Sequence, residues 1–166
     1  MAGSFLRPER GTLDAALRSV DAQLRLARAP DGPAIEALLG GAVAMEWGLP
    51  DDIAGSVRAV AEESSNSFIV VLERAGHVVA ACGVHVLPDL LANQGQILVD
   101  DLVVDPRTRH AGLGSTLIRG VLAVAAATSA RRVFMALDPH NTKGRRLLEK
   151  HGLVESGDRL WAWTAL

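Results

Sequence analysis

The sequence predicts one α/β domain built on a mixed central sheet of about seven strands, with helices on both faces. Two observations lead to this prediction. Short runs of β-branched and apolar residues alternate with segments in which apolar residues recur at helical spacing, a pattern typical of mixed α/β folds. In addition, 49% of the 166 residues are hydrophobic, which is enough to build a sizeable core in one domain.

The first half of the chain opens with an expected loose tail over residues 1–11 and a short helix over 12–23. Leu13, Leu17 and Val20 form one apolar stripe on this helix. We treat residues 1–23 as an N-terminal extension of a domain that covers 24–166. The further elements expected in this half are a strand at 24–28, helices that begin near residues 30 and 51, and strands at 68–73 and 77–87 joined by a tight turn.

The second half of the chain alternates strand-like and helix-like segments. Gly152 follows the last helical pattern and suits the position just after a helix. The elements expected here are a strand at 96–104, a helix at 112–128, a strand at 133–137, a helix at 142–151, and final strands at 153–155 and 159–164.

Composition narrows the class of protein. The net charge of −2 gives no indication of nucleic-acid binding, and the single cysteine, Cys82, excludes an intrachain disulfide. Cys82 lies in an apolar run and is expected to be buried, and no second ligand cluster joins it with His77 and His85 in a metal site. The N-terminus lacks the apolar stretch of a signal peptide and Arg119 interrupts the longest apolar helix, so we expect a cytoplasmic protein that does not enter membranes.

The stretch 100–118 carries the clearest functional signal. A β-branched run ends at Val104, an Asp-Pro pair breaks it, and Gly112 and Gly114 introduce an apolar helix. The first N–H groups of a helix have no intrahelical partner and lie at the positive end of its dipole. Glycines allow a phosphate to approach these groups closely. The stretch therefore predicts a site for a phosphorylated cofactor.

Three motifs in order resemble the GCN5-related N-acetyltransferase (GNAT) superfamily. They are VDDLVVDP at 99–106, RHAGLG at 109–114 and NTKGRRLLEKHGL at 141–153. Family members carry R/Q-x-x-G-x-G/A after a strand that ends in V-x-P, followed by N-x-x-A-x-x-L-Y-E-K-x-G-F. The resemblance covers residues 96–153 and implies the GNAT fold, whose sheet splays near its fourth strand.

The resemblance also implies acetyl-CoA as co-substrate. In this family the loop and helix start wrap the pyrophosphate, the preceding strand binds the pantetheine arm through exposed backbone, and an asparagine hydrogen-bonds that arm. The residues at these positions are Leu102, Val103, Val104, Arg109, His110, Ala111, Gly112, Leu113, Gly114, Ser115 and Asn141. Further candidates for contacts with phosphate are Arg107, Lys143 and Arg146.

The acid pair Asp100 and Asp101 supplies the candidate catalytic residues. An alkylammonium has a pKa near 10.4, so an amine needs a base before it can attack a thioester. The pair resembles the E-D-L/F-x-V strand of polyamine-type acetyltransferases, in which the first acid is the general base. Adjacent strand residues point to opposite faces, so one aspartate is expected to meet substrate. The match favours Asp100, although a bulge in this strand would reverse that choice.

One departure from the family pattern concerns the general acid. The tyrosine that reprotonates the CoA thiolate falls at Leu148, and the chain contains no tyrosine. Water, His151, His140 and Ser115 remain as substitutes. The expected activity is acetyl transfer to a primary amine of a small molecule or peptide, and the alternative is a non-catalytic CoA-binding sensor or structural subunit. A homodimer through the terminal strands or the N-terminal helix is compatible with the sequence.

Two nucleotide-binding folds fit less well. In a dinucleotide-binding loop the third glycine would fall at Leu117, and the seven residues between Val104 and Gly112 are too many for its tight turn. A P-loop is excluded because no G-K-[ST] follows the glycines. The acidic and aromatic segment 46–52 is a candidate wall of the acceptor pocket, or a helix cap. Trp161 and Trp163 are expected in the core or at a dimer surface.

Overall fold

The computed structural model describes residues 9–42, 52–62, 66–89, 94–108 and 111–156. The chain divides into two compact units, Met1–Ala136 and Leu137–Leu166, and each is described by itself. The first unit contains α1 (Arg10–Val20), β1 (Leu24–Leu26), α2 (Gly32–Ala42), α3 (Ile53–Glu62), β2 (Ser67–Arg74), β3 (His77–Asp89), β4 (Gln94–Val104), α4 (Leu113–Ala127) and β5 (Ala130–Met135), together with short 3-10 segments at Ala29–Asp31 and Pro106–Thr108. The second unit contains α5 (Thr142–Lys150).

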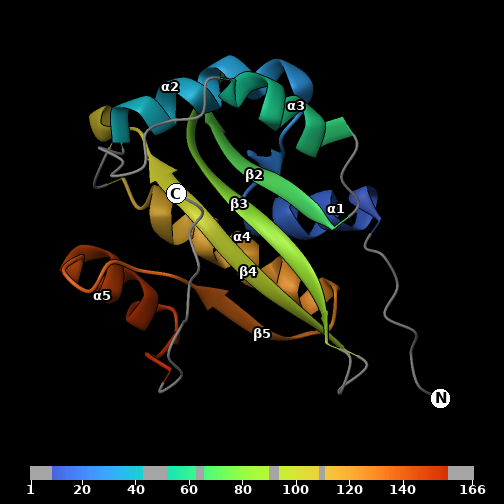
Figure 1. Cartoon of the computed structure of the whole chain (residues 1–166), viewed down its shortest axis with the longest axis vertical. Coiled ribbons are helices and arrows are strands. Elements are labelled where there is room, and N and C mark those ends of the chain that lie inside the picture. The colour runs from blue at the N-terminus through green and yellow to red at the C-terminus, as the bar shows by residue number, and fades with distance from the viewer. Residues whose placement is uncertain (1–8, 43–51, 63–65, 90–93, 109–110, 157–166) are drawn as a thin grey trace, which may run out of the picture. The chain divides into compact units, whose positions relative to one another are not determined.

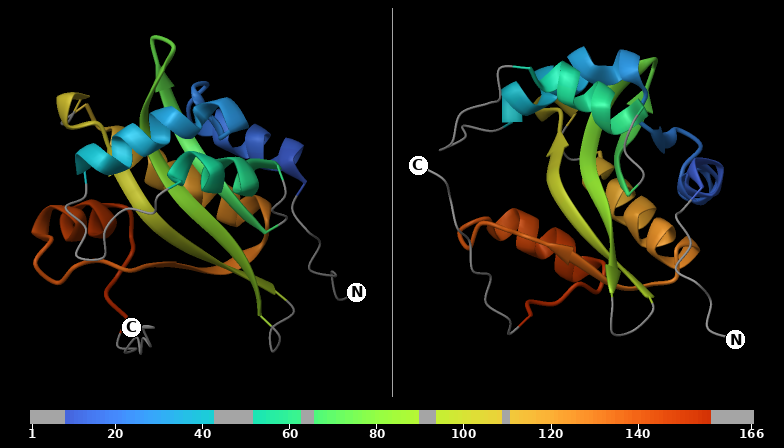
Figure 2. Two further views of the ribbon diagram at one scale, coloured as in Figure 1. Left: turned by 45° about the horizontal axis from the view of Figure 1, so that its top comes forward. Right: turned by 45° about the vertical axis from the view of Figure 1, so that its right-hand side comes forward.

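The sheet of the first unit has the strand order β1-β2-β3-β4-β5 (Figure 1). The first three pairings are antiparallel, and β4 pairs with β5 in parallel. Parallel neighbours need a crossover connection, which α4 supplies here. Helices α2 and α3 lie over one face of the sheet and α1 and α4 over the other (Figures 1 and 2). The predicted α/β class with helices on both faces is therefore confirmed.

The number of strands differs from the prediction of about seven, because the described residues form five. Residues 153–156 belong to no helix or strand, although 153–155 were expected to begin one, and Val154 is 84% exposed. Three residues carry too little periodicity to define a strand, which forms only beside a hydrogen-bonded neighbour. The strand predicted at 159–164, with Trp161 and Trp163, lies outside the described residues.

Each face of the sheet has its own apolar core. Along β2 the side chains of Val70 and Leu72 enter the core beneath α1 and α4, whereas Val71 enters the core beneath α2 and α3. This alternation is the period-two pattern of a strand that is covered on both faces. It gives a simple rule for assigning other residues of the sheet to one face or the other.

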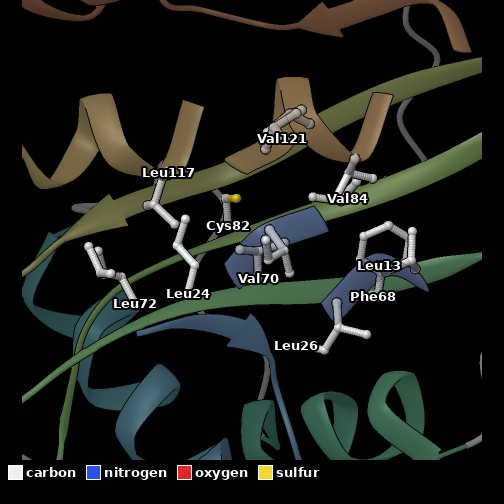
Figure 3. Packing of buried hydrophobic residues seen from close by; sticks show 14 of the residues in the cluster. Leu13, Leu24, Leu26, Phe68, Val70, Leu72, Cys82, Val84, Leu117 and Val121 are labelled. Carbon is white, nitrogen blue, oxygen red and sulfur yellow. The ribbon is translucent and has the colours of Figure 1, made fainter. Parts of the chain in front are cut away.

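The core beneath α1 and α4 includes residues from the N-terminal segment. Leu13 and Leu17 of α1 belong to the same buried cluster as Leu117 and Val121 of α4. Figure 3 shows Leu13, Leu117 and Val121 among the side chains of this cluster. Cys82 is buried in the same core as expected, and burial raises the pKa of its thiol to about 12. Across the described ranges, no helix is long and apolar enough to cross a bilayer.

Candidate active site

A bulge interrupts β4 at the acid pair. Ala81 of β3 faces Val103, but Gly83 faces Asp100, so Asp101 and Leu102 together stand opposite a single residue of β3. The φ angle of Asp101 is 46°, in the left-handed region that side chains rarely adopt. A bulge leaves one extra residue and shifts the alternation of side chains beyond it. The bulge that could alter the choice between the two aspartates is therefore present at the pair itself.

The carboxylate of Asp100 lies on the face of the sheet covered by α2 and α3. Its Oδ2 is 2.9 Å from Nε2 of His85, and Nδ1 of His85 is 2.9 Å from the hydroxyl oxygen of Ser67. Because a carboxylate can only accept, Nε2 carries the proton in this pair, and Nδ1 of a neutral imidazole then accepts from the hydroxyl. The side chains of Asp100 and His85 are 45% and 32% exposed, so this hydrogen-bonded chain is open to solvent.

Gly83 makes room for the Asp100 carboxylate. A Cβ atom at position 83 would overlap Oδ1 of Asp100 and lie 3.1 Å from its Cγ. The φ angle of Gly83 is not positive, so the strand backbone itself does not require glycine at this position. The lack of a side chain therefore lets Asp100 lie across β3 and reach His85.

Asp101 has a different electrostatic environment. Loss of solvent and then the negative charge of Asp100 raise the pKa of Asp101, and His85 opposes part of this effect. Two adjacent carboxylates cannot both ionise freely, so the second is held closer to its neutral form. Asp100 is therefore the carboxylate with an imidazole partner, and Asp101 is the one with the raised pKa.

The edge of β4 that faces β5 is open beyond the shared pairing. Gly95 to Val99 pair with β5, which ends at Met135. Asp100, Val103 and Val104 still pair with β3, but residues 100–104 have no strand on their other side within the described part of the chain. The two strands diverge in Figure 1. An open backbone edge at 102–104 is the geometry expected for a strand that pairs with a pantetheine arm.

Helix α4 begins with a backbone that is open toward solvent. Gly112 is its N-cap with a φ of 74°, and a Cβ atom at this position would meet nothing within 4 Å. The first intrahelical bond runs from the N–H of Thr116 to the carbonyl of Gly112, so earlier N–H groups point out of the helix end. Leu113 is buried beneath this turn and fixes it on the sheet.

The other candidates for the cofactor have mixed outcomes. Arg109 and His110 lie outside the described residues. Arg107 turns back onto buried Asp105, with Nη2 2.8 Å from Oδ2, so a phosphate would have to compete for this guanidinium. Asn141 is the N-cap of α5, where its Oδ1 accepts from the N–H of Gly144 at 2.8 Å.

The predicted wall of the acceptor pocket is described only in part. Glu46, Trp47 and Asp51 lie outside the described residues. Asp52 precedes α3, and its Oδ1 accepts from the N–H of Gly55 at 2.6 Å, so it caps this helix as the second interpretation predicted. Capping accounts for the aspartate without a role in the pocket.

A separate pocket of about 560 Å³ opens between α2, the β2–β3 turn and the end of β4. Its polar lining includes Arg25, Asp31, Glu73 and His77, and Arg25 forms hydrogen-bonded ion pairs with both Asp31 and Glu73. The pocket contains neither aspartate of the acid pair, so the candidate chemistry does not lie within it.

The family follows from a sequence comparison. A family model described as the acetyltransferase (GNAT) family matches residues 38–153. The chain belongs to this GNAT acetyltransferase family. The match includes the acid pair, the glycine loop and α5, so the family that the three motifs resemble is confirmed.

Known proteins similar to this GNAT chain differ in their acceptors. A Bacillus subtilis (strain 168) relative with the provisional name of a ribosomal protein bS18 alanine N-acetyltransferase is 25% identical over 97 residues, which span 58% of this chain and 60% of that protein. A ribosomal-protein-alanine N-acetyltransferase from Brucella melitensis biovar Abortus 2308 has a TM-score of 0.70 at 15% identity, covering 86% of this chain and 99% of that one. An aminoglycoside acetyltransferase from an uncultured soil sample has a TM-score of 0.72 at 16% identity, covering 89% and 99%. Both structures establish the fold and leave the acceptor open.

The sequence analysis missed Ser67 and Gly83 and considered His85 only as a metal ligand. The pattern contains a partial signal, since His85 and Gly83 are spaced by two on one strand. The strand register decides which residues of β2 and β4 lie opposite Gly83 and His85. This register contains irregularities that cannot be predicted from the residues themselves.

Proposed function

We propose that this GNAT protein transfers an acetyl group from acetyl-CoA to a primary amine, with Asp100 at the position of the base. The observation that carries the proposal is the bulge in β4. It sets the Asp100 carboxylate on the α2/α3 face, directly beside the stretch of β4 whose outer edge pairs with no strand of the described ranges. An acceptor amine on one side and a thioester on the other would meet at this bulge.

The features on either side of the bulge fit acetyl-CoA. In the proposed complex the pantetheine arm lies along Leu102, Val103 and Val104, and the pyrophosphate lies at the start of α4. The open space at Gly112 supports this placement, because a phosphate needs close access to backbone N–H groups. Residues 109–115 complete the proposed cofactor site of the first unit, and a contact from Asn141 of the second unit stays a prediction of the family resemblance.

The reaction begins with loss of a proton from the ammonium. At neutral pH this step costs about 4–5 kcal/mol for an amine of ordinary basicity. The amine lone pair then attacks the thioester carbonyl carbon, and a backbone N–H near Leu102 or Val103 donates to the developing oxyanion. The carbon–sulfur bond breaks, and the CoA thiolate leaves with the electron pair. The nitrogen then loses its second proton, and the thiolate takes up one proton by way of water, which gives the amide and free CoA.

The acceptor class is a primary amine of a small molecule or a peptide. The names of the similar proteins suggest where to begin, with peptides that start with alanine and then aminoglycosides. A cytoplasmic location and a homodimer stay predictions.

The decisive test compares Asp100→Asn with Asp101→Asn, which make the same change one residue apart. We expect Asp100→Asn to lower kcat by about a hundredfold or more, while acetyl-CoA affinity by calorimetry stays within a few-fold of wild type. A fully active Asp100→Asn together with an inactive Asp101→Asn would transfer the base to Asp101. Full activity in both variants would remove the acid pair from the mechanism.

A second candidate function is acetyl-CoA binding without turnover. The observation that favours it is Leu148, which stands where the family carries its acidic tyrosine. Acetyl-CoA consumption measured against a panel of amines, amino acids and peptides separates the two functions. Tight binding of acetyl-CoA with no consumption above buffer for any acceptor would establish the sensor function.

A further inference from the structure

Three polar side chains form a hydrogen-bonded chain across three adjacent strands. Ser67 lies on β2, His85 on β3 and Asp100 on β4, and each neighbouring pair is joined at 2.9 Å. Cys82 and Val84 point into the core beneath α1 and α4, so the alternate residues Gly83 and His85 point to the opposite face. These three hydrogen-bonded side chains thus lie on the face of the sheet where the acceptor amine is proposed to bind.

We propose that Asp100 and His85 act as one proton-accepting pair, in which the proton taken from the amine resides on the imidazole, and that Gly83 is the positioning residue that keeps the pair together. This inference rests on the proposed function, since it names the groups that receive the proton in acetyl transfer. Its basis is the 2.9 Å contact between Nε2 of His85 and Oδ2 of Asp100.

The chemistry of the two side chains favours such a pair. A free imidazole binds a proton about 400-fold more tightly than a free aspartate carboxylate, because their ordinary pKa values are about 6.5 and 3.9. A carboxylate alone is therefore a weak base toward an ammonium. A carboxylate that is hydrogen-bonded to an imidazole stabilises the imidazolium, so the pair accepts a proton over a wider pH range than the carboxylate alone.

The proton transfer balances within the groups present. An ammonium N–H bond breaks, and its electron pair stays on the nitrogen. The released proton goes to Nδ1, the ring nitrogen that carries none, by way of the Ser67 hydroxyl, which takes up this proton as it passes its own to Nδ1. The net charge of the pair changes from −1 to 0 as the imidazole becomes an imidazolium. The imidazolium then donates from Nε2 to Asp100 and from Nδ1 to the oxygen of Ser67, so the existing contacts serve both protonation states.

Gly83 determines whether Asp100 reaches His85. A methyl group at position 83 would occupy the space of Oδ1 of Asp100, and the three atoms nearest to it all belong to this residue. The carboxylate is the end of a flexible side chain and can turn away, so the strand itself should tolerate alanine. Gly83→Ala should consequently separate the pair while it leaves the fold intact.

The first experiment tests the imidazole with His85→Gln. The glutamine amide can still donate to Asp100 but cannot take up a proton, so it keeps the position and removes the chemistry. We expect kcat to fall at least tenfold, with the KM for acetyl-CoA unchanged. We also expect the acidic limb of the kcat profile to move to lower pH, toward the range of a carboxyl group. Asp100 and Asp101 are two ionisable groups that interact with His85.

A His85→Gln variant that keeps both the wild-type rate and the wild-type pH profile would overturn the proposal. A loss of rate without movement of the acidic limb would show that His85 only positions Asp100, which also overturns its role as proton holder. Absence of acetyl transfer by the wild type would instead refute the proposed function. These results are distinguishable because wild type and Asp100→Asn are measured in the same series.

The second experiment compares Gly83→Ala with Gly11→Ala in α1. A Cβ atom at position 11 would meet nothing within 4 Å, so this variant is a matched control far from the pair. We expect Gly83→Ala to lower kcat at least tenfold with a melting temperature within a few degrees of wild type, and Gly11→Ala to keep the wild-type rate. Equal rates in Gly83→Ala and wild type would show that the Asp100–His85 contact is not needed.

Discussion

Replacing Leu17 with alanine tests whether the N-terminal helix α1 belongs to the folded core. Leu17 is 0% exposed and packs in the core beneath α1 and α4. Fully buried leucine-to-alanine changes cost about 2.7–5.0 kcal/mol, so we expect a loss of about 3 kcal/mol in the free energy of unfolding. For a chain of this size that corresponds to roughly 6–12 °C in Tm. Urea unfolding followed by far-UV circular dichroism measures the loss directly.

Leu87→Ala provides a matched control, since Leu87 is 44% exposed and the same change should cost less than about 1 kcal/mol. Should Leu17→Ala behave like this control, α1 would be an appendage, and residues 24–166 would form the domain without it. A large loss would instead require that the cooperative unit begin before residue 24. The extension would then be structural rather than dispensable.

A second substitution locates the packing partner of Leu17. A Cβ atom on Gly120 of α4 would lie 3.1 Å from Cδ2 of Leu17 and 2.9 Å from Cδ1 of Leu24. Gly120→Ala alone should therefore crowd the core, which offsets the roughly 1 kcal/mol that alanine gains over glycine in a helix. In the Leu17→Ala background the methyl group has more room, and we expect a favourable coupling of about 0.5–1 kcal/mol. Strict additivity would place α1 elsewhere.

Two further predictions concern the cofactor loop and acid stability. Gly112→Val should weaken acetyl-CoA binding by about tenfold or more in calorimetry, because the valine side chain enters the open space before α4. Gly76→Val is the control, since Gly76 also has a positive φ and open space around it, and this variant should lose stability but keep its affinity for acetyl-CoA. Equal affinities in the two variants would remove the loop from the site. Hydrogen bonds from arginines lower the pKa of Asp21 and Asp105, so the stability they add is present above the ordinary carboxyl pKa near 3.9 and is lost as the pH falls through the depressed values. The urea midpoint should therefore drop between pH 5 and pH 2, and a flat midpoint would contradict this.

Much of the fold was predictable because the periodicity of apolar residues, and the glycine and proline residues at element ends, mark its helices and strands locally. The helix at the glycine loop was expected over 112–128 and is found at Leu113–Ala127, since Gly112 marks its start and a continuous apolar stripe fills its length. The strand expected at 96–104 is found at Gln94–Val104 for a similar reason, as a β-branched run ends at a proline. Boundaries shift by a few residues where pairing with a neighbouring strand extends an element beyond its pattern.

The last strands could not be predicted in this way. Residues 153–155 offered only a three-residue apolar pattern, and the structure leaves them without a partner strand among the described residues. Local propensity is a weak guide where a strand depends on a distant neighbour. The expectation for this segment was therefore wrong, whereas the preceding helix was placed correctly because its signals are local.

The candidate site shows the same limit within the sheet. The β2–β3 turn pairs Arg74 with His77, and a regular ladder from that turn would set Val84 opposite Ser67. An irregularity at Glu73 adds one residue to β3 and brings His85 into that place instead. No sequence pattern marks this extra residue, so the Ser67–His85 contact was not predictable.

The second irregularity completes the chain of three side chains. The bulge in β4 sets Asp101 and Leu102 opposite one residue of β3, so that Asp100 shares a face with His85 while Leu102 still packs on the opposite core. A regular strand could not meet both conditions, because residues two apart share a face. An aspartate in the left-handed conformation at 101 is the local strain that allows the change of phase. The acid pair is thus both the candidate catalytic group and the point at which the sheet changes register.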